Sequence, residues 1–419
     1  MCIIIEVSAE PVVNDPSLQV VPVITGIKFP TSMEFIGDND ILLLEKNQGT
    51  VRRIVNGTML NEPLLDVNVA NKAERGMLGI AITRNETKDG DEPKEYVFLY
   101  YTESNSKDGE DLEEGGLALG NRLYRYELEN NKLINPKLLL DLPAESGADH
   151  QGGVVLIGPD KNVYLVIGDV NHFNEAQNML DRKAPDGSSG ILRITQNGKL
   201  IQHEDNLGSV DPLNKYYAYG IRNSFGMDFD PVSGNLWDTE NGINCCDEIN
   251  LVKQGFNSGW ARVQGIWELN QSERTERVGV FDKASDKEKL VDFDGKGKYS
   301  SPEFIWNFSV GPSALRFLGS GKLGHQYMND IFVGDVNNGN IYHFDLTKDR
   351  TALSLNNVLE DKIADKIEEL DDIVFAKGLG RITDIEVGPD GNLYILSHLW
   401  DDDPCLRNGT IYKVSKIDN

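Results

Sequence analysis

The sequence predicts an all-β fold, a six-bladed β-propeller with four antiparallel strands per blade and long inserted loops at one end. Two observations predict it: one hairpin pattern recurs six times along 419 residues, and the 41 glycines suit a chain with many tight turns. In each copy an alternating apolar stretch meets a turn with Gly, Asp or Pro, and a second alternating strand follows. The copies begin at Ser32, Gly76, Val154, Gly226, Ser313 and Ile382.

Turns and insertions explain the irregular spacing of the copies. The turns GPDKN, DPVSGN and GPDGN supply the positive φ angles that hairpins need. A four-stranded blade needs roughly 40 residues, so the longer repeats must contain extra loops. In a propeller such loops gather at the ends of the central channel, where they can build a pocket. The clearest polar insertions are Glu103 to Gly116, Glu268 to Lys298 and Val358 to Asp372.

The two ends of the chain are predicted to close the ring. Leu18 to Phe29 and Gly409 to Val414 both read as strands, and pairing them within one blade removes an exposed sheet edge. Because no linker separates the repeats, residues 1–419 are predicted to form a single propeller domain, with residues 1–17 as an extended N-terminal segment. A pair of β-sandwiches is the alternative, but it does not explain six copies of one hairpin.

Charge narrows the range of partners. The formal net charge is −26, and such a surface repels nucleic acid and anionic lipid. The acid excess either maintains solubility or, in part, supplies oxygen ligands for Ca²⁺. No stretch approaches the roughly 18 consecutive apolar residues of a membrane helix, so no transmembrane segment is expected.

The N-terminal region bears on the location of the protein. No signal peptide is visible. Cys2 precedes a short apolar run, so one interpretation is a lipid anchor at Cys2, and the alternative is an arbitrary start of the sequence. Five Asn-x-Ser/Thr tripeptides suit an exported protein, and we expect a secreted, periplasmic or cell-surface location. They begin at Asn56, Asn85, Asn270, Asn307 and Asn408.

One of the six histidines stands out as a candidate catalytic base. His150 lies in the polar, Gly-rich loop from Ser146 to Gly153, just before a strongly β stretch that ends at Asp169. A loop histidine and a strand-end aspartate can meet at the same end of one blade. The carboxylate then fixes the imidazole tautomer and raises the basicity of the other nitrogen. The alternative is that His150 is an ordinary polar loop residue.

Several consecutive motifs carry a family resemblance. ADHQGGVVLIGPDKNVYLVIGD, YAYGIRNSFGMDFDPVSGNLW, DEINLVKQGFNSGW, ERGMLGIAI and RITDIEVGPDGNLYIL occur in this sequence. They resemble successive signatures of the soluble glucose and aldose sugar dehydrogenases that use pyrroloquinoline quinone (PQQ). The resemblance runs from about Ile24 to Lys413 and supports the fold more strongly than the activity.

The resemblance implies roles for individual residues. His150 matches the base that removes the proton from the C1 hydroxyl of the sugar, Asp169 matches the carboxylate that orients it, and Asp149 lies where the family contacts substrate. A guanidinium in the quinone pocket can hold the quinone oxygens as negative charge develops. The implied cofactor-binding positions are Glu74, Asp149, Arg222, Asn223, Arg381 and Trp306, the last near the mouth of the pocket.

Calcium is implied on the segment Gly242 to Ser258. Gly242 and Ile243 match the turn whose carbonyls hold the Ca²⁺ that polarises the cofactor. Glu248 matches a ligand of a second, structural Ca²⁺, and Ser258 belongs to the same metal-binding segment. Hard oxygen ligands of this kind are what Ca²⁺ prefers.

The sequence also departs from the family pattern. A Lys that holds the quinone carboxylates reads Asn337 here, and one of two Arg residues reads Thr383. The expected Gln reads Glu74, and the expected Pro after Gly242 reads Ile243. The adjacent Cys245 and Cys246 either close a small disulfide ring that stiffens the turn or remain two unpaired thiols.

The resemblance implies a sugar dehydrogenase that transfers hydride from an aldose to PQQ and then passes electrons to an external acceptor, as a monomer or homodimer. The main alternative comes from the missing cations: a non-catalytic, Ca²⁺-binding propeller that has lost quinone affinity and acts as a binding module. A metal-dependent hydrolase of the lactonase type is the third interpretation. It would require several carboxylates and Asn side chains to converge on one axial metal.

Overall fold

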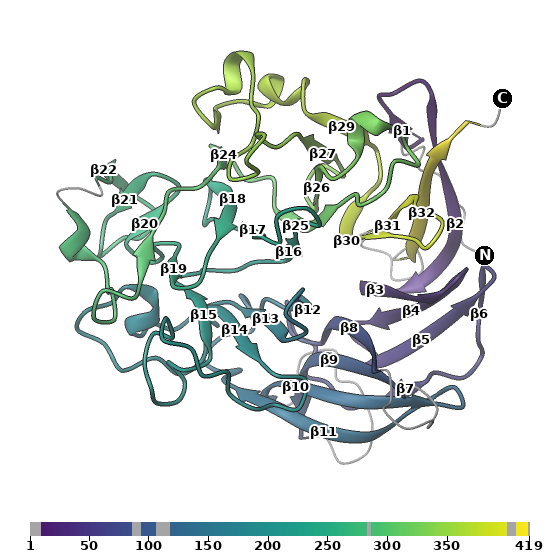
Figure 1. Cartoon of the computed structure of the whole chain (residues 1–419), viewed down its shortest axis with the longest axis horizontal. Coiled ribbons are helices and arrows are strands. Elements are labelled where there is room, and N and C mark those ends of the chain that lie inside the picture. The colour runs from purple at the N-terminus through teal and green to yellow at the C-terminus, as the bar shows by residue number, and fades with distance from the viewer. Residues whose placement is uncertain (1–9, 86–93, 106–117, 283–285, 400–407, 418–419) are drawn as a thin grey trace.

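The computed structural model describes residues 10–85, 94–105, 118–282, 286–399 and 408–417, and this part of the chain is all-β. In these ranges six sheets of four to six strands each are arranged around a common centre (Figure 1). A smaller three-stranded sheet lies to one side of them. The complete helices of the described ranges are five short 3-10 helices: η1 (Glu175–Gln177), η2 (Lys287–Lys289), η3 (His325–Tyr327), η4 (Asn357–Leu359) and η5 (Ile367–Leu370).

We number the six larger sheets by the chain order of the hairpins that they contain, and we call the strand that begins each hairpin the first strand of its sheet. Sheet 1 contains β3 (Pro30–Gly37), β4 (Asp40–Glu45), β5 (Thr50–Val55), β6 (Thr58–Met59) and β7 (Leu65–Asp66). Sheet 2 contains β8 (Met77–Asn85), β9 (Lys94–Ser104), β10 (Ala118–Glu129) and β11 (Lys132–Leu142). Sheet 3 contains β12 (Val155–Ile157), β13 (Val163–Ile167), β14 (Gly190–Ile194), β15 (Tyr216–Tyr219), β19 (Phe256–Asn257) and β23 (Lys298–Tyr299).

The second half of the chain forms the remaining sheets. Sheet 4 contains β16 (Gly226–Phe229), β17 (Leu236–Glu240), β18 (Asp247–Val252), β24 (Phe304–Trp306) and β28 (Ile363–Ala364). Sheet 5 contains β25 (Pro312–Phe317), β26 (Ile331–Asp335), β27 (Ile341–Phe344), β29 (Val374–Lys377) and β1 (Val12–Val13). Sheet 6 contains β30 (Arg381–Val387), β31 (Leu393–His398), β32 (Asn408–Lys416) and β2 (Leu18–Lys28). The small side sheet contains β20 (Val263–Gln264), β21 (Trp267–Leu269) and β22 (Arg277–Val280).

Each of the six predicted hairpins supplies the first two strands of its own sheet. The turns have the predicted geometry, with positive φ at Lys161 (62°), Gly234 (73°) and Gly391 (76°). The first and last of these turns are built alike. The carboxylates of Asp160 and Asp390 each accept a hydrogen bond from a tyrosine hydroxyl four residues further along the chain. The alternating pattern therefore located the hairpins correctly.

The chain ends pair as predicted. Strand β2 runs antiparallel to β32, from Leu18 opposite Lys416 to Lys28 opposite Asn408 (Figure 1). The preceding segment is not a free arm, because β1 pairs with β29 and adds a strand to sheet 5. Cys2 lies outside the described residues.

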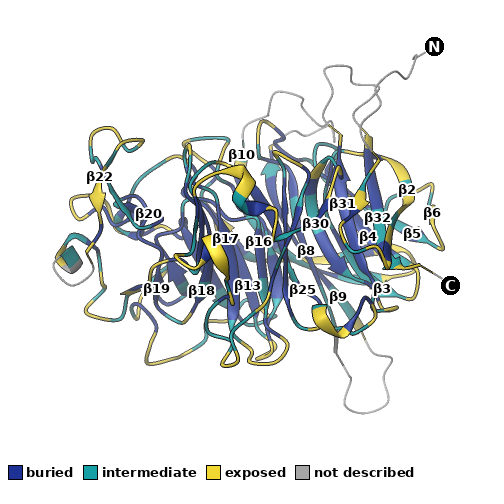
Figure 2. Cartoon of the chain, turned by 90° about the horizontal axis from the view of Figure 1, so that it is seen from above, coloured by how far each residue is buried: buried dark blue, intermediate teal, exposed yellow. Residues whose placement is uncertain are grey.

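Apolar side chains fill the space between neighbouring sheets. Six large hydrophobic clusters join sheets 1 and 2, 2 and 3, 3 and 4, 4 and 5, 5 and 6, and 6 and 1. Both faces of most sheets are therefore buried, and the exposed residues gather in the turns, on β22 of the side sheet and on outer strands such as β2 (Figure 2). No helix in the described ranges is long and apolar enough to cross a membrane.

Two of the predicted loop insertions contain short strands instead. The segment from Glu268 to Lys298 carries β22 and the helix η2. The segment from Val358 to Asp372 carries β28, which pairs in parallel with β24. A few buried apolar residues, such as Leu359 and Leu370, anchor that otherwise polar segment. Most of the third insertion, residues 106–117, lies outside the described residues.

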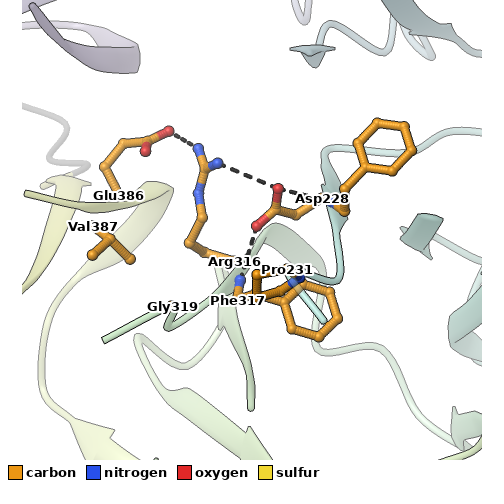
Figure 3. A pocket seen from close by; sticks show the side chains of 8 residues that line it. Asp228, Pro231, Arg316, Phe317, Gly319, Glu386 and Val387 are labelled. Atoms are coloured by element: carbon orange, nitrogen blue, oxygen red, sulfur yellow. Dashed lines mark hydrogen bonds and ion pairs between the residues drawn. The ribbon is translucent and has the colours of Figure 1, made fainter. Parts of the chain in front are cut away.

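A charged network lies where the first strands of sheets 1, 4, 5 and 6 approach one another. Arg316 on β25 forms ion pairs with Asp228 on β16 and Glu386 on β30 (Figure 3). Asp384 on β30 accepts hydrogen bonds from the backbone N–H of Met33 (2.8 Å) and the hydroxyl of Ser32 (3.0 Å). A cavity of about 270 Å³ opens beside Arg316, lined by Asp228, Phe229, Pro231, Arg316, Phe317, Gly319, Glu386 and Val387.

Acidic residues outnumber the single arginine of this network. Burial raises the pKa of Glu34 on β3 to about 7, against the lowering effect of Arg316. Burial also raises the pKa of Asp384 to about 6, again against the effect of Arg316. Above pH 7 the folded protein must therefore keep a poorly solvated carboxylate at Glu34, which lowers its stability.

We predict that Glu34→Gln stabilises the protein at about pH 8 and has little effect at about pH 4. The folded-state pKa of Glu34 is raised, so the stability associated with its protonated form is lost as the pH rises towards 7. One pKa unit corresponds to about 1.4 kcal/mol, and screening by solvent reduces the full shift, so we expect about 1–2 kcal/mol from denaturant unfolding. The exposed Glu62→Gln removes the same charge and should show no such pH dependence. Equal effects of the two variants at both pH values would contradict the prediction.

Candidate active site

His150 and Asp169 meet as the sequence predicted. The Nδ1 atom of His150 lies 2.7 Å from Oδ1 of Asp169, whose side chain is only 1% exposed. The loop that carries His150 leads into β12, and Asp169 follows β13, so one hairpin brings both residues to the same end of sheet 3. Asp169 also accepts hydrogen bonds from the indole Nε1 of Trp260 (2.7 Å) and from the backbone N–H of Asn171 (2.8 Å).

This arrangement determines which imidazole nitrogen can act as a base. Asp169 accepts hydrogen bonds from Trp260 and Asn171, so its carboxylate is held as an acceptor for His150. We therefore assign the proton of the neutral imidazole to Nδ1, which leaves a lone pair on Nε2. The side chain of His150 is 14% exposed, so the imidazole is not fully enclosed.

Glu74 links the loops that precede the first strands of sheets 2, 3 and 4. Its carboxylate accepts hydrogen bonds from the backbone N–H of Gln151 (3.1 Å) and from the side-chain amide of Asn223 (3.1 Å). Asn223 in turn accepts a hydrogen bond from the backbone N–H of Gly152 (3.2 Å). Burial raises the pKa of Glu74, and nearby His150 opposes this shift. Glu74 and Asn223 thus hold the His150 loop from two sides.

Lys46 supports the loop that carries Glu74. Its ammonium donates hydrogen bonds to the backbone carbonyls of Asn71 (3.2 Å), Ala73 (2.9 Å) and Arg75 (2.7 Å). Burial lowers the pKa of Lys46 to about 8, and the nearby Glu74 carboxylate opposes this shift. Lys46 therefore fixes the backbone on both sides of Glu74.

Arg222 spans the space between the Asp169 region and the Gly242 turn. Its Nη1 atom donates to the carbonyls of Asn241 and Gly242, both at 2.9 Å, and its guanidinium lies 5.6 Å from the ring centre of Trp260. Burial lowers the pKa of Arg222, although several carboxylates, Asp169 first among them, oppose this shift. In the described part of the chain, the buried Nε of Arg222 has no hydrogen-bond partner.

The turn at Gly242 is closely packed. The Gly242 N–H donates to Oδ1 of Asp247 (2.8 Å), and Oδ2 of Asp247 accepts from the N–H groups of Val310 (2.7 Å) and Gly311 (2.8 Å). A Cβ at Gly242 would lie 1.8 Å from the carbonyl oxygen of Cys245, so only glycine fits there. Asp247 thus ties the turn to the loop before β25.

Cys245 and Cys246 form a disulfide in this turn. Arg277 on β22 donates to the sulfur atoms of Cys245 (2.6 Å) and Cys246 (2.9 Å) and to the side chain of Asn307 (2.6 Å). The backbone N–H of Cys246 donates to the carbonyl of Trp306 at 2.8 Å. Of the two alternatives for these cysteines, the structure contains the disulfide ring and not two unpaired thiols.

Glu248 lies in a separate buried carboxylate cluster, which we define as Asp238, Glu240, Glu248 and Asn250. On the paired strands β17 and β18, Asp238 lies opposite Asn250 and Glu240 lies opposite Glu248. Because side chains alternate along a strand, all four share one face of the sheet. Ser258 donates a hydrogen bond to Glu240 (2.5 Å), which connects the predicted metal residue Ser258 to this cluster.

The cluster holds three carboxylates with little to neutralise them. Asp238 is fully buried, and in the described part of the structure neither of its carboxylate oxygens nor Oδ1 of Asn250 has a hydrogen-bond partner. Burial raises the pKa of Asp238 and of Glu248, and it raises the pKa of Glu240 to about 7. Three buried acids, of which Asp238 has no hydrogen-bond donor in the described residues, form a donor set that suits a hard cation.

The remaining predicted residues have different environments. Asp149 is exposed beside His150, with Oδ2 3.4 Å from the amide nitrogen of Asn171. Arg381 is exposed at the start of β30. Ile243 donates its N–H to the side chain of Gln264 (3.4 Å). In the described part of the chain, Glu248 has hydrogen bonds with Asn250 and Gly265 and none with the turn at Gly242.

Trp306 corrects one expectation from the sequence. It is fully buried on β24 rather than at the mouth of a pocket. Its ring packs against Phe304 (4.9 Å between ring centres) and Tyr342 (5.4 Å) within the apolar interface of sheets 4 and 5. The pairing of Trp306 with Asp247 across β18 and β24 turns its side chain into the core.

Sequence reasoning missed four residues of this region. Trp260 closes a motif that carried the family resemblance, yet its contact with Asp169 depends on the fold. Lys46 gave no signal. Asp238 and Glu240 are two residues apart and share one face of a strand, which is the usual spacing of solvent-facing positions. Glu248 and Asn250 repeat that spacing on the next strand, and this repeat is the signal that could have identified the cluster.

We predict that Trp260→Phe destabilises the protein more than Trp306→Phe does. Both changes replace a buried indole by a smaller ring, but only Trp260 donates a hydrogen bond to a carboxylate. Hydrogen bonds to charged groups contribute about 1.5–3 kcal/mol, so the two free energies of unfolding should differ by about that amount. Equal destabilisation by both variants in urea titrations would show that the bond to Asp169 contributes nothing.

Comparisons with known proteins agree with the geometry. The Glucose / Sorbosone dehydrogenase family matches residues 27–403. Aldose sugar dehydrogenase YliI of Escherichia coli is 26% identical over 370 residues, covering 88% of this chain and 86% of that protein. The crystal structure of the soluble aldose sugar dehydrogenase from Escherichia coli in the apo-form has a TM-score of 0.69 and 22% identity, covering 96% of this chain and 100% of that one. The PQQ-bound form of aldose sugar dehydrogenase from Streptomyces coelicolor has a TM-score of 0.63 and 21% identity, covering 96% and 99%. The chain therefore belongs to the glucose/sorbosone dehydrogenase family.

Proposed function

We propose that this protein is a PQQ-dependent sugar dehydrogenase that oxidises the C1 hydroxyl of an aldose. The observation that carries the proposal is the pair formed by His150 and Asp169, 2.7 Å apart, beside the guanidinium of Arg222. Family membership and the PQQ-bound relative support the same chemistry. An external acceptor then takes up the electrons.

His150 acts as the general base in this proposal. Its Nε2 accepts the proton of the C1 hydroxyl, and the buried Asp169 carboxylate stabilises the imidazolium that results. Asp149 is exposed next to the base, where it can accept a hydrogen bond from the sugar. Glu74 and Asn223 keep the His150 loop in place through the contacts with Gln151 and Gly152.

The residues around His150 fit a quinone. PQQ, when bound, supplies the hydride acceptor. Arg222 offers a buried Nε donor without a partner in the described residues, which suits an acceptor oxygen, and Asn223 and Arg381 complete the proposed contacts. Asn337 and Thr383 provide no positive charge, so Arg222 carries a larger share of the electrostatic attraction.

We also propose that the six sheets are the blades of a single six-bladed propeller, with the chain ends sharing one blade. The cycle of six apolar interfaces supports this arrangement. The pairing of β2 with β32 closes the ring, since it joins the first and last parts of the chain in sheet 6.

An extracytoplasmic location completes the proposal. The disulfide between Cys245 and Cys246 supports it, because such bonds persist in oxidising compartments. The protein acts there as a monomer or homodimer.

Calcium is the cation that we propose for the buried carboxylate cluster. Glu248 is the ligand implied by the family resemblance, and Asp238, Glu240 and Asn250 add oxygen donors from the same sheet face. The carbonyls of the Gly242–Ile243 turn remain the proposed site of a second Ca²⁺, the one that would polarise the cofactor. Arg222 already donates a hydrogen bond to the carbonyl of Gly242.

The central test of the function is His150→Gln. We expect turnover on aldoses with added PQQ to fall by about 10²–10⁴-fold, the usual contribution of a positioned general base. The variant should still fold, although losing the hydrogen bond to Asp169 should lower its free energy of unfolding by up to about 1.5–3 kcal/mol. Asp169→Asn should lower turnover as well, because it disturbs the imidazole tautomer. His203→Gln is the matched control. His203 also pairs with an aspartate, Asp205 (3.4 Å), but it lies outside the proposed site.

Two results would overturn the proposal. A folded His150→Gln variant with wild-type turnover would remove His150 from the mechanism. Wild-type protein with neither PQQ affinity nor aldose oxidation, measured by fluorescence titration and dye reduction in the presence of Ca²⁺, would leave a non-catalytic binding module.

The calcium site is tested by measuring the free energy of unfolding of the wild type and of Asp238→Asn, each in excess Ca²⁺ and in chelator. In excess Ca²⁺ the variant should be less stable than the wild type because it loses a ligand. In chelator the order should reverse, because the variant lacks one uncompensated buried carboxylate. The free energy of unfolding of the wild type should fall by about 2.7 kcal/mol on chelation if Ca²⁺ was present at about 100 times its Kd.

Asp181→Asn is the control for this test. The side chain of Asp181 is 83% exposed, so this variant should show no reversal. If chelator leaves the wild-type melting temperature unchanged and Asp238→Asn has the same effect with and without Ca²⁺, the cluster does not bind the ion.

A further inference from the structure

Two carboxylates and one imidazole converge in sheet 5, where the inner strand β26 begins and the neighbouring strand β27 ends. Asp330 directly precedes β26, His343 lies in β27, and Asp345 directly follows β27. Ile331 pairs with Phe344, so the register places Asp330 opposite Asp345. His343 is two residues before Asp345 and therefore projects from the same face.

The distances among these side chains match those between ligands of one small metal ion. His343 Nε2 lies 3.1 Å from Oδ2 of Asp330 and 3.6 Å from Oδ1 of Asp345. One donor atom from each of the three residues lies within 4.8 Å of the others. Tetrahedral ligands about 2.1 Å from Zn²⁺ are about 3.4 Å from one another. The three donors need little movement to reach that geometry.

Electrostatics favours a cation between the two aspartates. Like charges directly opposite each other on antiparallel strands destabilise a sheet. In the described residues no Lys or Arg forms an ion pair with Asp330 or Asp345.

The imidazole of His343 is held in place by aromatic rings. Tyr327 lies edge-on at 5.1 Å between ring centres, Phe332 lies at 5.1 Å, and Phe375 lies at 6.5 Å. These contacts direct Nε2 towards the aspartates without using either ring nitrogen. A ligand that is already oriented loses little conformational freedom when it binds a metal.

We propose that Asp330, His343 and Asp345 form a binding site for a divalent transition-metal ion such as Zn²⁺, separate from His150 and from the proposed Ca²⁺ cluster. One nitrogen and two carboxylate ligands favour such an ion over Ca²⁺, which prefers oxygen ligands alone. Three protein ligands leave a coordination position for water. The bound ion connects the start of β26 to the end of β27.

Calorimetric titration with Zn²⁺ in excess Ca²⁺ tests this proposal, because Ca²⁺ keeps the buried carboxylate cluster occupied. We expect the wild type to bind one Zn²⁺ at this site, and His343→Gln and Asp345→Asn to weaken that binding at least about tenfold. Asp345 is 59% exposed, so its variant should fold even if His343→Gln does not. His203→Gln is the matched control, because His203 pairs with one aspartate but belongs to no three-residue metal-ligand group among the described residues.

Co²⁺ gives an independent readout through its visible absorption. The bands of Co²⁺ bound to the wild type should be lost in Asp345→Asn and retained in His203→Gln and His150→Gln. Unchanged Zn²⁺ affinity in both His343→Gln and Asp345→Asn, or loss of binding in His150→Gln instead, would overturn the proposal. Neither outcome depends on dehydrogenase activity, so the two proposals can fail separately.

Discussion

The rest of the structure depends on the apolar packing between neighbouring sheets. Each sheet buries side chains on both faces, so no sheet is stable without the neighbours that cover it. This packing brings the starts of the first strands together, although they are distant in sequence. Glu74 before β8, Gln151 before β12 and Asn223 before β16 meet through direct hydrogen bonds. The site around His150 is thus a consequence of how the sheets pack, and its loops need no separate core.

Buried carboxylates in this acidic protein are stabilised in different ways, and the differences indicate their roles. Asp169 accepts three hydrogen bonds, one of them from His150. Asp247 accepts three from backbone N–H groups, which is typical of a structural carboxylate that ties loops together. Asp238 is as deeply buried, yet within the described ranges its oxygens have no donor. A carboxylate without donors in an apolar environment requires a proton or a cation, and this is what distinguishes the cluster on β17 and β18 from the other buried acids.

Local patterns predicted the hairpins, the turn at Lys161 and the meeting of His150 with Asp169, because each depends on residues close together in sequence. Apart from the pairing of the two chain ends, features that depend on which distant strands pair were not predicted. Trp306 was expected near a pocket mouth, but the pairing of β18 with β24 directs it into the core. Asp238, two residues before Glu240 on one strand, has the spacing that is typical of a solvent-facing position. Only the neighbouring sheet and the Ser258 segment, which cover that face, make it a buried acid.

Arg222 connects the two parts of the proposed site through its backbone as well as its side chain. Its carbonyl accepts a hydrogen bond from the N–H of Asp169 (2.9 Å), and its own N–H donates to Oε1 of Glu240 (2.7 Å). Asp169 orients His150, whereas Glu240 belongs to the buried carboxylate cluster. A cation in that cluster would draw on the same Glu240 carboxylate that holds the Arg222 backbone. Arg222 is therefore a direct structural connection between the carboxylate that contacts His150 and the buried carboxylate cluster, and this connection uses only backbone groups of one residue.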